Sequence, residues 1–121
     1  MKRVSIFLFL VIATFTGYYI LNYNNYSIYN ITDATTEQKI VLKTNKDIVD
    51  IDGIELKIIG NIDGEASLYV IESDKIYKVI YLKNNVNIDF KSEWYNNSVT
   101  LLYDPYNVKD AGKLKIYYQF K

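Results

Sequence analysis

The chain has 121 residues, and its 14 basic and 14 acidic side chains leave a formal net charge of zero. It contains no cysteine and no histidine, which excludes a disulfide framework, thiolate metal sites and histidine-based acid–base chemistry. The balanced charge gives no signature of nucleic-acid binding, which requires a clustered basic face.

The chain begins with two positive charges, Lys2 and Arg3, followed by an uncharged apolar run from Val4 to Leu21. This layout is typical of a secretory signal or a signal anchor. Eighteen helical residues span about 27 Å, which nearly matches the ~30 Å hydrocarbon core of a bilayer. We therefore predict one N-terminal transmembrane or signal helix over residues 1–21. It would leave the rest of the chain outside the cytoplasm, either anchored in the cell membrane or, after cleavage, secreted.

The remaining chain divides into a polar segment and one domain. Residues 22–38 show no apolar period and are predicted to form a stalk or linker, with an irregular first strand as the alternative. Residues 39–121 are long enough for one domain with a single core. We predict that this domain lies outside the cytoplasm.

Turn signals recur every 10–12 residues in this domain, as is typical of all-β sandwiches and barrels. They are Asp52-Gly53, Asp63-Gly64, Ser73-Asp74, Asn84-Asn85 and Asn96-Asn97. Between them, apolar and polar residues alternate, which predicts strands with one buried face and one solvent face. The residues predicted to face inward are Ile54, Leu56, Ile58, Ala66, Leu68, Val70, Val86, Ile88, Phe90, Leu114, Ile116, Tyr118 and Phe120.

The segment from Ile76 to Leu82 is apolar on both faces, which predicts a central strand covered on both sides. No part of the domain has a sustained helical period, so no helix longer than a turn or two is expected. The predicted fold is an all-β, antiparallel β-sandwich of about seven to eight strands in meander order, with a closed barrel as the alternative.

Calcium binding is the first chemistry to weigh, because several acidic residues lie near predicted turns. They are Asp47, Asp50, Asp52, Asp63 and Glu65. With Gly53 at the glycine position of a calcium loop, the first and last ligand positions fall on Ile48 and Ile59, which cannot bind calcium. The turns already explain the Asp-Gly pairs. We predict no metal site and no cofactor.

Aromatic residues beside amides and carboxylates form the second candidate. Trp94 and Tyr95 precede Asn96, and Tyr106 follows shortly after. Exposed rings beside such polar groups suit the binding of a carbohydrate or an envelope polymer. The competing interpretation is that Trp94 fills the core and donates its N–H to the backbone.

A small hydrolase that works through two carboxylates is the third candidate. Fourteen acidic residues produce a suitably spaced pair by chance, and no nucleophile motif or phosphate loop is present in the sequence. We therefore expect a protein that is not an enzyme.

The leading hypothesis is a membrane-tethered or secreted, non-enzymatic interaction or structural module. We expect a protein partner at a sheet face or edge that carries Tyr69, Tyr77 and Tyr117. The alternative partner is a glycan held by Trp94 and the tyrosines near it. Residues Val4 to Leu21 would provide the contact with the membrane.

Overall fold

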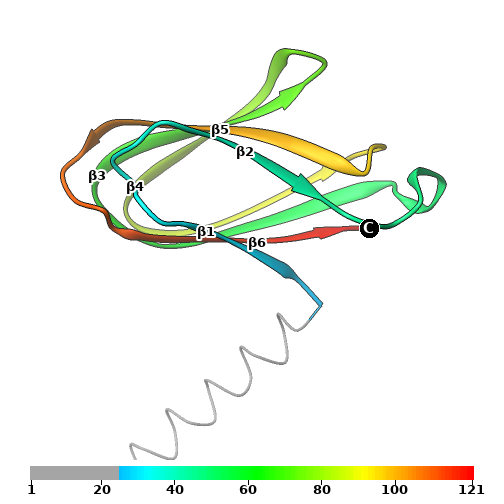
Figure 1. Ribbon diagram of the computed structural model, residues 1–121, viewed down its shortest axis with the longest axis horizontal. Helices are drawn as coiled ribbons and strands as arrows, with labels where there is room; N and C mark the ends of the chain where they lie inside the picture. Colours follow the sequence, from blue (N-terminus) through cyan, green and yellow to red (C-terminus); the bar gives the residue numbers. More distant parts are fainter. Residues whose placement is uncertain (1–24) are drawn as a thin grey trace, which may run out of the picture.

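The computed structural model describes residues 25–121. Its elements are β1 (Ser27–Ile31), β2 (Gln38–Lys43), the one-turn 3-10 helix η1 (Ile48–Asp50), β3 (Gly53–Glu72), β4 (Lys75–Glu93), β5 (Ser98–Val108) and β6 (Lys113–Phe120). All strand pairs are antiparallel and join into one six-stranded sheet in the order β1-β6-β3-β5-β2, with β4 paired to β3 (Figure 1). The prediction of an all-β, antiparallel fold is confirmed.

The helix predicted over residues 1–21 lies outside the described residues. Within residues 25–121, no helix is both long enough and apolar enough to cross a membrane.

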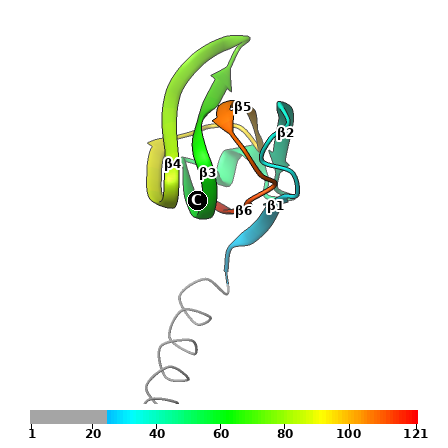
Figure 2. The same cartoon turned by 90° about the vertical axis from the view of Figure 1, so that its left-hand side faces the viewer.

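The shape of the sheet depends on a bend in the long β3–β4 hairpin. The first half of β3 pairs with β6 up to Asn61, and the second half pairs with β5 from Gly64 onward. At this crossing point Gly60 and Gly64 have φ angles of 149° and 140°, and on β4 the nearby Asn84 has φ 51°. Both strands of the hairpin therefore bend at the same level, and the sheet curls back on itself (Figure 2).

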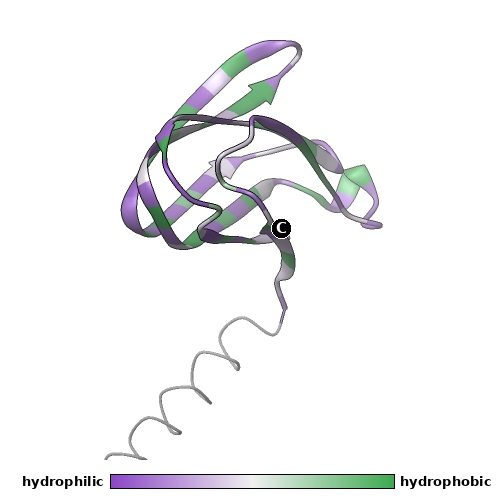
Figure 3. Cartoon of the chain, turned by 60° about the vertical axis from the view of Figure 1, so that its left-hand side comes forward, coloured by the Kyte–Doolittle hydropathy of each residue, from purple (hydrophilic) through white to green (hydrophobic). Residues whose placement is uncertain are grey.

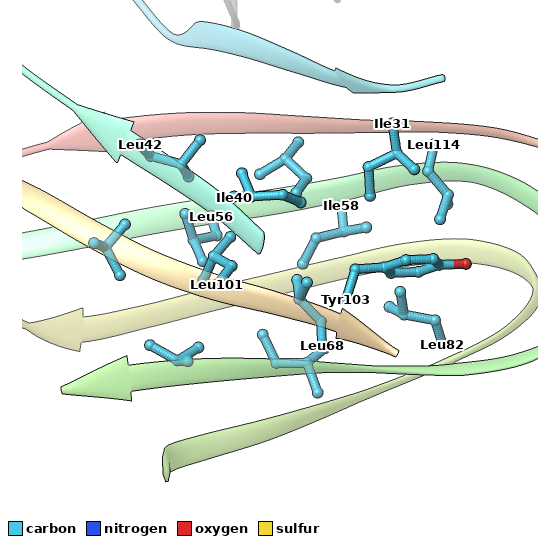
Figure 4. Packing of buried hydrophobic residues seen from close by; sticks show 14 of the residues in the cluster. Ile31, Ile40, Leu42, Leu56, Ile58, Leu68, Leu82, Leu101, Tyr103 and Leu114 are labelled. Atoms are coloured by element: carbon cyan, nitrogen blue, oxygen red, sulfur yellow. The ribbon is translucent and has the colours of Figure 1, made fainter. Parts of the chain in front are cut away.

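The inner face of the curled sheet encloses a single core. Hydrophobic and hydrophilic residues alternate along the strands (Figure 3), and all thirteen residues predicted to face inward either belong to this core or pack against it. Tyr103 is fully buried among the core side chains (Figure 4). Its hydroxyl donates to the carbonyl oxygen of Ala34 at 2.6 Å. Burial raises the pKa of Tyr103 to about 12, so the hydroxyl keeps the proton that it donates.

The predicted strand count and meander order are wrong, because most of the expected turns are not hairpin turns. Asp63-Gly64 and Asn84-Asn85 are bends inside β3 and β4, so two long strands stand where four were expected. Ser73-Asp74 is a true hairpin turn, since both residues have the positive φ angles of a type I′ turn, 50° and 63°. Asn96-Asn97 lies between β4 and β5, which do not pair with each other. Among the strands of residues 25–121, sequential strands are therefore neighbours only in the β3–β4 hairpin.

The prediction that residues 76–82 form a covered central strand is also wrong. This segment belongs to β4, which pairs with β3 alone among the strands of residues 25–121. Ile80 and Leu82 are buried, whereas Ile76 and Tyr81 are 60% and 70% exposed. The large apolar side chains on the second face are not covered by another part of the described chain.

The prediction of a stalk over residues 22–38 is wrong from Ser27 onward. The alternative prediction, a first strand, is correct, since β1 begins at Ser27. β1 pairs with β6 along its full length. Ile31 and Ala34 are buried in the core, and the Ala34 N–H donates to the carbonyl of Ala111 at 2.9 Å. The folded domain therefore begins before residue 39.

Candidate functional site

The most open part of the sheet is the free side of β4. An edge strand presents a row of backbone N–H and C=O groups that can pair with an added strand. β1 and β2, at the two ends of the sheet, have 5 and 6 residues, whereas β4 has 19. The turn end of the β3–β4 hairpin lies at the periphery of the molecule (Figures 1 and 2). β4 is thus by far the longest edge among residues 25–121.

Beside this edge, apolar side chains form a continuous surface on the outer face of the sheet. Across β3 and β4, Ile76 lies opposite Ile71 and Val79 lies opposite Tyr69. Directly opposed residues in antiparallel strands share a face, and their side chains are in contact distance. The surface, called the outer patch below, consists of Val41, Tyr69, Ile71, Ile76, Val79, Tyr81 and Leu102.

The outer patch continues across the other strands of this half of the sheet. Leu102 of β5 is the partner of Tyr69, and Thr100 of β5 is the partner of both Ile71 and Val41. The patch is bordered by Lys39, which lies opposite Leu102 on β2. An apolar centre with a polar rim is the usual arrangement of a protein interface.

A groove of about 270 Å³ lies next to the outer patch, at the turn of the hairpin. Ile71 and Thr100 line it together with Trp94, Tyr95 and Asn96. Tyr95 is exposed, and the negative charge of Glu93 raises the pKa of its hydroxyl. The groove therefore combines an exposed ring with hydroxyl and amide groups.

Trp94 itself is 5% exposed and fills the core edge, as the competing interpretation expected. Its Nε1–H donates to the carbonyl of Ser98 at 2.9 Å. Tyr77 packs edge-on against it with the ring centroids 6.2 Å apart, and the Tyr77 hydroxyl is 2.8 Å from the hydroxyl of Ser92. Because its ring faces are packed, Trp94 supports the groove but offers little surface for stacking on a ligand.

The remaining predicted site residues lie apart from one another. Tyr69 belongs to the half of β3 that pairs with β5, and Tyr117 belongs to β6, which pairs with the other half of β3. Tyr106 is exposed near the end of β5 and does not line the groove of Trp94 and Tyr95. The tyrosines named from the sequence therefore do not form one surface.

Glu55 contacts several polar side chains, which the sequence did not indicate. It lies between the inward-facing Ile54 and Leu56, so the alternation predicts that it faces solvent. It is 8% exposed, and its carboxylate accepts a hydrogen bond from the Tyr26 hydroxyl. Its Oε1 lies 2.8 Å from the Lys121 Nζ and 3.6 Å from the Lys91 Nζ. The two sequence neighbours of Glu55 are apolar and give no sign of these contacts. Tyr26 and Lys121 are distant in sequence and reach Glu55 only in the folded chain.

Two opposing effects act on the pKa of Glu55. Burial raises it, but the hydrogen bonds from Lys121 and Tyr26 and the charges of Lys121 and Lys91 outweigh burial, so the pKa lies below its ordinary value of 4.5. Glu55 therefore stays ionised and links Tyr26 and Lys121, which follows β6, to β3 and β4. A general acid would need the opposite shift.

Replacing Glu55 with Gln should lower the stability of the domain at pH 7 by about 2 kcal/mol, because charge-assisted hydrogen bonds are lost. The folded-state pKa is below the unfolded one, so this stabilisation is complete above the unfolded pKa and disappears as pH falls through the folded one. The melting temperatures of wild type and Glu55→Gln should thus converge as the pH falls below the folded-state pKa of Glu55. The control is Glu65→Gln, whose ion pair with Lys83 is exposed and 3.4 Å long and should contribute little at any pH. An equal effect of both variants would contradict the role of Glu55.

The acidic residues considered for calcium do not assemble into a site. Among residues 25–121, no three acidic side chains are close enough together to hold a metal ion. Asp47 instead accepts a hydrogen bond from the Val49 N–H at the start of η1.

Comparison with known proteins gives only distant structural likenesses. No protein-family model and no curated protein matches the chain. A crystal structure of PirA aligns with a TM-score of 0.49 and 10% identity, over 78% of this chain and 94% of that one. A structure from Bacillus endospore appendages, a family of disulfide-linked pili, gives 0.48 and 14%, over 79% and 84%. A CBM4 structure gives 0.43 and 8%, over 79% and 71%. Likenesses at this level assign neither a family nor a function to this chain.

Proposed function

We propose that this chain is a non-enzymatic binding module that engages an extended segment of a protein partner along β4. The single observation behind the proposal is the combination of an open 19-residue edge with exposed apolar side chains beside it. An added strand would pair with the backbone of β4, and its side chains would meet Ile76 and Tyr81. Backbone pairing would provide affinity, and the outer patch would provide selectivity.

Two features support a non-enzymatic role. The chain contains neither histidine nor cysteine. Its most enclosed carboxylate, Glu55, is held ionised by Lys121 and Tyr26, which suits a structural link better than proton transfer. We also propose that the curled sheet is a β-sandwich rather than a closed barrel. Two observations support this: the two halves of β3 pair with different strands, β6 and β5, and the sheet encloses a single core.

The proposal predicts that Ile76→Lys combined with Tyr81→Lys reduces partner affinity at least about tenfold, because each change replaces an apolar contact with a charged group that would have to be desolvated on binding. The isolated domain would be used to capture proteins from envelope extracts. Both side chains are largely exposed, so the melting temperature should stay within about 2 °C of wild type.

The matched control is Val49→Lys on η1, which changes an 85% exposed apolar residue outside the outer patch. It should leave capture unchanged. Equal capture by wild type and the double variant would contradict the proposal, as would equal loss with the control.

The groove beside the hairpin turn supports a second candidate function, the binding of a glycan or envelope polymer. Its specific basis is that the exposed Tyr95 lines the groove together with Asn96, Ser98 and Thr100, which carry amide and hydroxyl groups. On a glycan array, Tyr95→Ala should abolish binding while Ile76→Lys/Tyr81→Lys preserves it. The reverse result would assign the ligand to the outer patch.

We further propose that residues Val4 to Leu21 hold the domain outside the cytoplasm as a single membrane span. The charges of Lys2 and Arg3 and the length of the apolar run support this. The full-length chain should remain in the membrane fraction at high salt, because an apolar span does not depend on ionic contacts. A soluble mature protein that begins between Gly17 and Asn22 would show cleavage and contradict the anchor.

A further inference from the structure

A polar cleft lies at the end of the sheet where β2 and β6 finish and β1 begins. Its volume is about 480 Å³, within the ~300–1,000 Å³ range of small-molecule sites. Eight of the residues that line it carry amide, hydroxyl or ammonium groups: Asn25, Ser27, Lys43, Thr44, Asn45, Lys46, Tyr118 and Gln119. No carboxylate side chain is among its described lining residues.

Both lysines in the cleft lack a carboxylate partner among residues 25–121. The ion pairs in this part of the chain involve Lys57, Lys83, Lys91 and Lys121. The Lys46 Nζ lies 3.4 Å from the carbonyl oxygen of Phe120, which directs this ammonium group toward the wall of the cleft. Asp47, the nearest acidic residue in sequence, is engaged in starting η1. The lining of the cleft therefore includes two lysines without a carboxylate partner among residues 25–121, together with several hydrogen-bond donors.

We propose that this cleft binds a phosphate group. Lysine binds phosphate as a point charge. A phosphate monoester carries about −1.5 to −2 charges at pH 7, so two ammonium groups match it better than they match the single charge of a carboxylate. The amide donors of Asn25, Asn45 and Gln119 would complete the contacts to the phosphate oxygens. The ligand could be a soluble phosphate ester or the phosphate of a lipid headgroup, and both present the same chemistry.

The test uses the full chain in neutral detergent and glycerol 3-phosphate as the soluble probe. Saturable shifts of the amide resonances of Asn45 and Gln119 are expected on titration. Lys43→Gln combined with Lys46→Gln should weaken binding at least about tenfold through loss of two charged contacts. The matched control, Lys113→Gln with Lys115→Gln on β6, removes the same charge from outside the cleft and should bind like wild type.

A second arm distinguishes the sources of the phosphate. The full chain, reconstituted in neutral vesicles, is mixed with labelled vesicles that contain or lack anionic phospholipid. Binding to glycerol 3-phosphate supports a soluble ester, and selective association with anionic vesicles alone supports a headgroup, provided that the Lys43/Lys46 variant abolishes it. Three results would overturn the proposal. Acetate could bind as tightly as glycerol 3-phosphate, the control pair could weaken binding as much as the Lys43/Lys46 variant, or neither arm could show binding. None of these results depends on the β4 edge.

Discussion

Replacing Gly64 with alanine is expected to lower the melting temperature of the domain by at least about 10 °C. Gly64 has a φ angle of 140°, and a Cβ built there would lie 1.5 Å from the carbonyl oxygen of Asn107. Because that atom belongs to the backbone of β5, relief requires β3 and β5 to separate where β3 changes partner. Strain and lost pairing together should cost at least about 3 kcal/mol, a large share of the 5–15 kcal/mol typical of a domain.

Gly53→Ala is the matched control, since a Cβ at Gly53 meets its nearest atom at an ordinary 3.4 Å. Its stability should stay within about 1 kcal/mol of wild type in urea unfolding. Gly60→Ala tests the same bend independently, because its Cβ would lie 1.8 Å from the carbonyl oxygen of Lys113. Wild-type stability of both Gly60→Ala and Gly64→Ala would contradict the bend as described.

Removal of residues 1–38 should abolish cooperative folding, whereas removal of residues 1–24 should not. The longer deletion takes away β1 and leaves β6 as a new edge. It also removes the buried Ile31 and Ala34 and leaves the Tyr103 hydroxyl buried without its acceptor. Burial of one large aliphatic side chain contributes about 1.5–3 kcal/mol, and an unsatisfied buried polar group costs about 1–3 kcal/mol.

The two fragments, residues 39–121 and 25–121, can be compared by circular dichroism and thermal melting. The shorter one should show no sharp transition, and the longer one should melt once. Ile31→Asp in the longer fragment provides a point-mutation test, because it places a carboxylate in the core without removing the strand. A sharp transition of the 39–121 fragment near that of the 25–121 fragment would restore the stalk interpretation.

The inner faces of the strands could be predicted from the sequence, because apolar residues alternate with polar ones where one face of a strand is buried. Ile54, Leu56 and Ile58 were assigned to the core from a period of two, and all three are fully buried. The same logic failed for residues 76–82. Large apolar side chains on two faces predict cover on both, but Ile76 and Tyr81 remain exposed.

Strand order could not be predicted, because dipeptides of the same kind form a hairpin turn at one place and a bend within a strand at another. Ser73-Asp74 reverses the chain, whereas Asp63-Gly64 lies inside β3. The difference lies in the partner strands: β3 exchanges β6 for β5 at this level, and those strands lie more than 30 residues further along the chain.

The candidate site could be predicted only in part, because it also depends on which strands pair. A protein partner at a sheet edge was expected, but the edge itself could be identified only from the pairing of β4. The tyrosines proposed as one face are separated by the fold, with Tyr69 and Tyr117 on different halves of the sheet. Glu55 meets Tyr26, which lies 29 residues away in sequence, and such a contact has no local signature.

The β4 interface is tested most directly by photo-cross-linking of the full-length chain in cells that express it. A photoreactive phenylalanine analogue would replace Tyr81 in the outer patch and, as a control, Val49 on η1; both positions are largely exposed. The proposed interface predicts a discrete, light-dependent protein adduct from position 81 and none from position 49. Absence of an adduct at position 81, or the same adduct in equal yield from position 49, would contradict a partner bound along β4.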